Sequence, residues 1–140
     1  MSEIRVKALC VIRKSGKILV LRLNHSSGTV YKPLGGTVEF GEHTEAALQR
    51  EIIEELKTEI HTVSYLGFLE NVINFNEEIR HEIAFVYEAK LATIHLYNLA
   101  SIQVDDAGLR FIAEWIPLNN FRAERLTLVP EGLLELIDDS

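Results

Sequence analysis

Short apolar stretches near the start of the chain predict β-strands. Ile4 to Ile12 and Lys17 to Leu23 both have the composition and length of strands. The polar, glycine-containing stretch Arg13-Lys14-Ser15-Gly16 lies between them and favours a hairpin turn. Leu34-Gly35-Gly36 is expected to interrupt regular structure, because glycine weakens strands and helices alike. The chain should therefore begin with a β-hairpin followed by an irregular segment.

The pattern changes to a helical period between residues 44 and 56. Thr44 is a favourable N-cap residue, and Glu45 stands in the first turn, where a carboxylate interacts well with the helix dipole. On a helical wheel the apolar and acidic side chains occupy neighbouring arcs. The apolar arc holds Leu48, Ile52, Ile53 and Leu56, and the acidic arc holds Glu51, Glu54 and Glu55. One side of this helix should pack into the core, and the acids should form the other side.

The second half of the chain again reads mainly as strands. Val63 to Phe75 and Ile79 to Lys90 are predicted strands, joined by the polar turn Asn76-Glu77-Glu78. Residues 91–109 show no clear pattern, and Asp105-Asp106-Ala107-Gly108 within them is expected to be a loop. Arg110 to Ile116 resembles a further strand.

Pro130 is well placed to begin a closing helix that ends at Asp138, because proline suits the first helical position. Its inward side chains should be Leu133, Leu134 and Ile137. Strands thus flank one central helix, and a second helix follows. This order predicts an α/β fold in which a mixed β-sheet lies between helices, with residues 1–140 as a single domain.

Five aromatic residues are expected in the hydrophobic core and not on a surface that stacks nucleobases. These are Tyr65, Phe68, Phe85, Tyr87 and Trp115. Cys10 lies within a predicted strand and should be a buried, inert thiol. As the only cysteine, it excludes an intrachain disulfide, which suits a reducing, cytoplasmic setting.

Composition restricts the possible function. The chain is 47% hydrophobic and 25% charged, as in ordinary globular proteins. It contains no apolar run long enough to cross a bilayer, and MSEIRVKALC lacks the apolar region of a signal peptide. The net charge of −7 opposes binding to bare nucleic acid, so a small ligand is the more favoured partner.

The acids at the end of the central helix require an explanation. Carboxylates are unfavourable at a helix C-terminus, and Glu51, Glu54 and Glu55 also repel one another at spacings of three and four. A solvated acidic face is the simplest interpretation. A bound divalent cation would remove both objections, and an all-oxygen set of ligands suits Mg²⁺ or Mn²⁺ better than Zn²⁺. The five histidines show no metal-ligand spacing.

The spacing of these residues resembles the Nudix box, Gly-x5-Glu-x7-Arg-Glu-U-x-Glu-Glu-x-Gly-U, in which U is a bulky aliphatic residue. Six of its defining positions match: Gly36, Glu42, Arg50, Glu51, Glu54 and Glu55. With each residue type at about 7%, such a match arises by chance on the order of once in ten million starting positions. Lys57 and Thr58 depart from the terminal Gly-U pair. Lys57 implies either a strained left-handed cap, costing about 1 kcal/mol, or a helix that ends differently.

The resemblance implies a Nudix-type α/β/α sandwich and hydrolysis of a nucleoside diphosphate linked to another moiety, with Mg²⁺ or Mn²⁺ as cofactor. Carried over to this sequence, the metal ligands would be the carboxylates of Glu51, Glu54 and Glu55 and the carbonyl of Gly35. Arg50 would orient the glutamates, and Glu42 would hold the preceding loop against the helix.

The resemblance leaves the general base open, because members of the family take it from the box or from a later segment. Glu54 is the first choice within the box. Glu82 is the leading candidate outside it, followed by Glu77 and Glu78. An exposed Glu82 paired with Arg80 or Lys90 is the structural alternative.

Other questions stay open at the level of sequence. The substrate could be a nucleoside triphosphate, ADP-ribose or another nucleotide sugar, or a dinucleoside polyphosphate. A non-catalytic nucleotide sensor is the alternative function, although sensors commonly lose box acids that this chain retains. RNA decapping occurs in the family but is disfavoured by the acidic charge and the absence of a basic stripe. A homodimer is one option, since many relatives dimerise.

Overall fold

The computed structural model describes residues 2–25, 27–75 and 77–139 of the chain, which form strands packed against helices. The strands are β1 (Ile4–Val11), β2 (Arg13–Lys14), β3 (Lys17–His25), β4 (Gly28–Thr37), β5 (Ile60–Phe75), β6 (Glu78–Leu91), β7 (Ser101–Asp106) and β8 (Leu109–Pro117). The helices are α1 (Thr44–Leu56), α2 (Leu118–Arg122) and α3 (Leu133–Asp138), with the 3-10 helix η1 (Ile94–Asn98).

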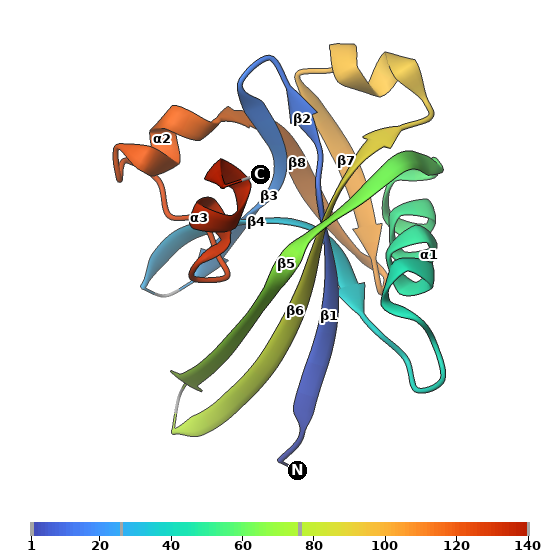
Figure 1. Cartoon of the computed structure of the whole chain (residues 1–140). Coiled ribbons are helices and arrows are strands. Elements are labelled where there is room, and N and C mark those ends of the chain that lie inside the picture. Colours follow the sequence, from blue (N-terminus) through green and yellow to red (C-terminus); the bar gives the residue numbers. More distant parts are fainter. Residues whose placement is uncertain (1, 26, 76, 140) are drawn as a thin grey trace.

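The strands form a mixed sheet with the order β5-β6-β1-β4-β3-β8-β7, and β2 pairs with β3. β1 and β6 are parallel, whereas the other pairs are antiparallel. β4 joins the two halves of the sheet, because its first part pairs with β3 and its last part with β1. Figure 1 shows α1 on one side and α2 and α3 on the other. The predicted α/β fold with a mixed sheet between helices is confirmed.

The sheet has an apolar cluster on each side. The cluster on the α1 side includes Ala8, Cys10, Leu34, Leu48, Ile52 and Trp115. The cluster under α2 and α3 includes Val11, Val20, Val86, Phe121, Leu133 and Ile137. Burial raises the pKa of the Cys10 thiol to about 12, as expected for an inert core cysteine.

The helix predicted for residues 44–56 is confirmed, but both of its ends differ from the simplest expectation. The N-cap residue is His43 and not Thr44, whose hydroxyl lies 2.5 Å from that of Tyr87. At the other end Lys57 is left-handed, with φ 58° and ψ 37°, and its backbone N–H donates to the carbonyl of Ile53 at 3.0 Å. Lys57 therefore adopts the conformation that glycine favours, so the strained cap is the alternative that the structure supports.

The left-handed cap leads to a prediction about stability. Replacing Lys57 with Gly should raise the free energy of unfolding by about 0.5–1 kcal/mol, because glycine adopts this conformation without steric cost. Urea denaturation of the metal-free protein measures the change. Glu59→Gly is the control, because Glu59 has no positive φ and glycine should only destabilise there. A lower stability for Lys57→Gly would show that the cap is not strained.

The prediction of an irregular segment at Leu34-Gly35-Gly36 is wrong, because all three residues lie in β4. Gly35 has φ 137°, and a Cβ at this position would lie 2.0 Å from the carbonyl oxygen of Ala8. The glycine is thus required for a close approach of β4 to β1 within the sheet.

Other boundaries need smaller corrections. Residues 91–109 contain η1 and β7, and only Ala107 and Gly108, with φ of 50° and 82°, form the turn. Arg13 and Lys14 form β2, and α2 was not predicted. The last helix begins at Leu133 and not at Pro130. Asn76, in the predicted turn before Ile79, lies outside the described residues, and Glu78 already belongs to β6.

The prediction that five aromatic residues lie in the core is wrong for two of them. Trp115 is buried and Phe85 and Tyr87 are half-buried, but Tyr65 is 54% exposed and Phe68 is 61% exposed. An apolar pattern shows which side of a strand avoids water, but it does not show whether another element covers that side. Ile53 likewise belongs to the apolar arc of the wheel and is 44% exposed.

Candidate metal centre

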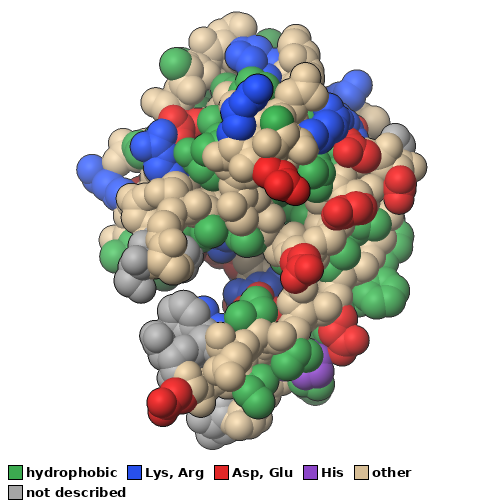
Figure 2. Space-filling model, turned by 90° about the vertical axis from the view of Figure 1, so that its left-hand side faces the viewer, with side chains coloured by type: hydrophobic (Ala, Val, Ile, Leu, Met, Phe, Trp, Pro, Cys, Tyr) green, Lys and Arg blue, Asp and Glu red, His purple; other side chains and the backbone are tan. Residues whose placement is uncertain are grey.

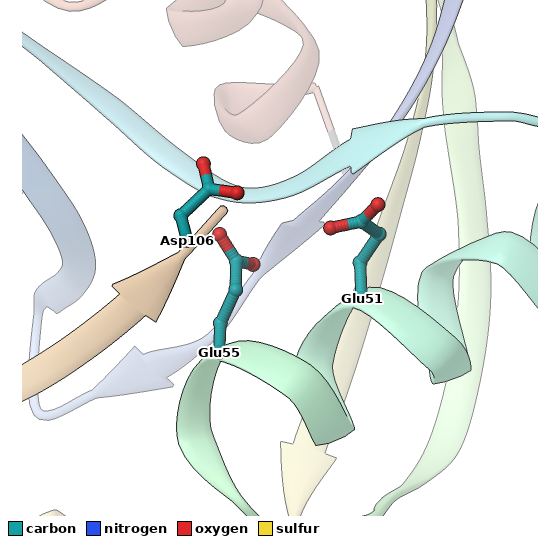
Figure 3. A group of neighbouring side chains, drawn as sticks. All are labelled: Glu51, Glu55 and Asp106. Carbon is teal, nitrogen blue, oxygen red and sulfur yellow. The ribbon is translucent and has the colours of Figure 1, made fainter. Parts of the chain in front are cut away.

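Three carboxylates meet between α1 and the end of β7. Glu51 and Glu55 extend from successive turns of α1, and Asp106 is the last residue of β7. One oxygen of each lies within 4.8 Å of the others. Figure 3 shows the three side chains pointing toward one another next to β4. We call Glu51, Glu55 and Asp106 the acidic triad.

The glycine pair of β4 provides the space that the triad needs. A Cβ at Gly36 would lie 2.3 Å from the carboxyl carbon of Glu51, so any larger residue would displace that carboxylate. The backbone N–H of Gly35 donates to Oε1 of Glu55 at 3.0 Å and fixes its direction. The triad is thus positioned by the backbone of β4 as well as by the helix.

The triad is electrostatically unfavourable by itself. Glu55 is only 2% exposed. Burial raises its pKa to about 8, with Asp106 and Glu51 raising it further and the Gly35 N–H opposing the shift. Burial also raises the pKa of Glu51, although Arg50 opposes this. A divalent cation would offset the repulsion, and three carboxylates are the hard oxygen ligands that Mg²⁺ or Mn²⁺ prefers. The residues therefore fit the metal that the sequence predicts.

The raised pKa of Glu55 predicts how the stability of the metal-free protein depends on pH. Folding raises this pKa from 4.5 to about 8, so the stabilisation from holding the proton is complete below pH 4.5 and is lost as the pH rises to 8. The melting temperature without metal should therefore fall over this range by more in the wild type than in Glu55→Gln. Mg²⁺ should restore more stability at pH 8 than at pH 6. Equal pH profiles for the two proteins would contradict this prediction.

Arg50 connects the helix to the loop that precedes it. Its guanidinium donates to both carboxylate oxygens of Glu42, at 2.8 and 2.9 Å, and to Oε1 of Glu51 at 3.0 Å. It also donates to the backbone carbonyl of Thr37 at 3.1 Å. The hydrogen bonds from Arg50 lower the pKa of Glu42 to about 2. Arg50 thus contacts one member of the triad and the loop acid together, which is the arrangement that the predicted orienting roles require.

The candidate bases lie outside the triad. The side chain of Glu54 is 58% exposed, and its Oε1 lies 3.6 Å from Nη1 of Arg50. Glu82 lies on β6, where its Cα pairs with Arg5 of β1 and Asn71 of β5. Glu78, the first residue of β6, and Glu77, just before that strand, are both exposed. The catalytic roles assigned to Glu54 and Glu82 stay predictions, and so does the metal-ligand role of Glu54.

Asp106 is the member of the triad that sequence reasoning missed. It lies in a segment whose sequence predicts only a loop. It is also far from α1 along the chain, so nothing in the sequence indicates that the two are in contact. The available signal is the pair Asp105-Asp106 before Ala107-Gly108. This signal is weak, because aspartate is common beside turns for conformational reasons alone.

Basic side chains accompany the triad. Lys7 donates from Nζ to Oγ1 of Thr37 at 3.0 Å, and Thr37 directly follows Gly36. Burial lowers the pKa of Lys7, and Glu82 and Glu51 oppose that shift. Lys32 is close enough to influence both Lys7 and Glu55. On the side of the molecule viewed in Figure 2 the surface is deeply indented, and Lys or Arg side chains lie within the indentation.

Comparison with known proteins gives a family for the chain. The NUDIX domain matches residues 1–137. Among curated proteins the chain is similar to two proteins named NAD-capped RNA hydrolase NudC. The one from Pasteurella multocida is 34% identical over 59 residues, and the one from Photorhabdus laumondii is 40% identical over 56 residues. These matches cover 42% and 40% of this chain, and 22% of each relative.

Solved structures show the same fold. A MutT NUDIX hydrolase from Burkholderia pseudomallei has a TM-score of 0.66 at 24% identity, over 84% of this chain and 86% of that one. A NUDIX hydrolase from Nitrosomonas europaea has a TM-score of 0.70 at 19% identity, over 98% and 88%. Within the described part of the chain, no helix has the length and apolar character needed to span a membrane. The match over nearly the whole sequence, together with this fold, shows that the chain belongs to the Nudix family.

Proposed function

We propose that the chain is a metal-dependent pyrophosphohydrolase that cleaves a phosphoanhydride bond in a nucleoside diphosphate linked to another moiety. The acidic triad, converging beside the glycine pair of β4, is the observation that carries the proposal. A solvated acidic face does not explain it, because Glu55 is almost fully buried. A sensor that only binds nucleotide would not need such a costly cluster of carboxylates.

In this proposal the triad and the carbonyl of Gly35 hold Mg²⁺ or Mn²⁺. When bound, the ion would neutralise charge on the phosphate oxygens and make the phosphorus atom more susceptible to attack by water. Arg50 keeps Glu51 directed at the site through the hydrogen bond at 3.0 Å. Lys7 and Lys32 add positive charge next to the triad, which suits a substrate with more phosphate charge than one ion neutralises.

We retain Glu54 as the proposed general base, because its exposed carboxylate is accessible to water and adjoins Glu55 on α1. Glu54→Gln should lower kcat at least 100-fold while leaving Mn²⁺ affinity within a factor of about three, since base catalysis contributes 10²–10⁴-fold. Glu82→Gln, made in parallel, should retain most of the activity. The reverse result would assign the base to Glu82. A joint loss of metal binding in Glu54→Gln would make Glu54 a ligand.

The substrate can be identified with a panel of nucleotides. Nucleoside triphosphates, ADP-ribose, other nucleotide sugars, dinucleoside polyphosphates and an NAD-capped oligonucleotide should be incubated with Mg²⁺ or Mn²⁺. The capped RNA belongs in the panel because of the names of the curated relatives, although the net charge of −7 favours the small nucleotides. We expect turnover of at least one small nucleotide that EDTA stops. Tight nucleotide binding without any product would instead support the sensor.

A further inference from the structure

α2, α3 and the loop between them form a groove on the outside of the molecule. Its volume is about 580 Å³, which is within the range of clefts that bind ligands. In Figure 1 these segments lie on the opposite side of the sheet from α1. We call this site the C-terminal groove. Its lining contains no member of the acidic triad, so it is separate from the candidate metal centre.

The floor of the C-terminal groove is apolar. Phe121 of α2 is buried, and Leu126, Leu128 and Leu134 are half-buried. These leucines pack against the apolar cluster under α2 and α3, and the groove exposes part of them. An apolar side chain that entered the groove would gain about 25 cal/mol for each Å² of apolar surface removed from water. The floor therefore suits an apolar anchor.

Backbone hydrogen bonds fix the loop that forms one wall of the groove. The amide of Leu126 donates to the carbonyl of Asn120 at 3.2 Å. The amide of Tyr31 in β4 donates to the carbonyl of Thr127 at 2.9 Å, and the carbonyl of Tyr31 accepts from the amide of Val129 at 2.8 Å. The groove is thus formed before any partner binds, which lowers the entropic cost of binding.

The rim of the groove is acidic. Glu124 lies in the loop after α2, Glu131 lies just before α3, and Glu135 lies within α3. All three side chains are exposed. The described residues that line the groove include no Lys, Arg or His. An apolar floor is therefore combined with a rim of one sign of charge.

The basic residues of the same segment contact other groups. Arg122 forms a salt bridge with Asp138 at 2.6 Å. Arg125 donates to Oδ1 of Asn120 at 3.4 Å. The carboxylates of the rim are therefore available to a partner. Positive charge on that partner would also be attracted by the net charge of −7.

We propose that the C-terminal groove binds a basic peptide segment of another protein, in which an apolar side chain that enters the groove is flanked by Lys or Arg. The apolar anchor supplies most of the affinity, because it is removed from water in the groove. The flanking cations face the carboxylates of the rim, and complementary charge increases the association rate and the specificity. A segment that is acidic, or polar without an anchor, lacks one of these contributions.

Fluorescence anisotropy with labelled hexapeptides tests the proposal. The probe KKLLKK has two leucines between pairs of lysines and should bind with a Kd below about 100 µM at low salt. The probe KKSSKK lacks the anchor, and EELLEE has the opposite charge. Each should bind at least about 10-fold more weakly than KKLLKK. Added NaCl should weaken the binding of KKLLKK, because salt screens exposed charges.

Charge reversal determines where the probe binds. Glu124→Lys combined with Glu131→Lys should raise the Kd of KKLLKK at least about 10-fold. Glu45→Lys combined with Glu59→Lys is the matched control, because it changes the net charge equally at exposed positions outside the groove. This control should raise the Kd by less than about threefold. Leu126→Ser, which shortens the floor, should also raise the Kd about 10-fold, and circular dichroism checks that each variant is folded.

The proposal would be overturned if KKLLKK showed no saturable binding at about 500 µM protein. Equal binding of KKSSKK or EELLEE would also overturn it, because charge or apolar contact alone would then be sufficient. Equal effects of the two double variants would place the binding outside the groove. These outcomes are independent of the proposed hydrolysis, since none of the substituted residues belongs to the acidic triad.

Discussion

Replacing Glu55 with Gln is expected to lower kcat/KM for the best nucleotide substrate by about 1,000-fold or more. The substitution removes one of the three carboxylate charges that would hold the ion, and the loss of about 4 kcal/mol of transition-state stabilisation corresponds to this factor. Steady-state kinetics at saturating Mg²⁺ measures the effect. Raising the Mg²⁺ concentration should recover only part of the activity, because the amide is a weaker ligand than the carboxylate.

The fold should survive this change. A neutral amide at position 55 avoids the burial of charge that raises the pKa of Glu55 to about 8, so the metal-free variant should be at least as stable as the wild type near pH 8. Glu59→Gln is the matched control, because Glu59 is exposed just beyond α1 and should have no effect on activity. Activity within threefold of the wild type for Glu55→Gln would remove Glu55 from the site.

The second large effect is expected for Gly36→Ala. The added Cβ would lie 2.3 Å from the carboxyl carbon of Glu51, so the carboxylate must move away from the triad. Mn²⁺ affinity should fall at least 100-fold, and crowding should lower stability by about 1–3 kcal/mol. Electron paramagnetic resonance of free Mn²⁺ measures the affinity, and urea denaturation measures the stability.

Gly28→Ala provides the control for this substitution. Gly28 has φ 132° and open space around its Cβ position, so alanine there is strained but contacts nothing. Gly36, in contrast, does not have a positive φ and is required only for the space that it leaves. Gly28→Ala should therefore lower stability without changing Mn²⁺ affinity. Equal affinities in the two variants would show that Gly36 does not shape the site.

The part of the site that lies on α1 could be predicted from the sequence because its signal is local. Spacing along one helix fixes which acids share a side, and the same segment contains Arg50 and Glu42, which contact each other. The orientation of the helix could not be predicted in this way, because it depends on contacts with segments that are distant in sequence. Contact with β4 and β7 turns Glu51 and Glu55 inward and leaves Glu54 at the surface.

Asp106 could not be predicted because it joins the triad through sheet topology. β7 is the last strand of the sheet in space, and only its pairing with β8, and that of β8 with β3, brings its end next to α1. The exposure of Tyr65 and Phe68 has a similar origin. Their strand pattern is that of core residues, and it is the limited reach of α1 that leaves them uncovered.

Binding of Mn²⁺ to the acidic triad is the most direct test of this account. Electron paramagnetic resonance should compare the wild type with a protein that carries Glu51→Gln, Glu55→Gln and Asp106→Asn, each with and without a non-hydrolysable nucleotide. The wild type should bind Mn²⁺ saturably, Mg²⁺ should displace it, and the triple variant should lose the binding while remaining folded. Equal Mn²⁺ binding by the two proteins, or none by the wild type even with nucleotide, would contradict the central claim.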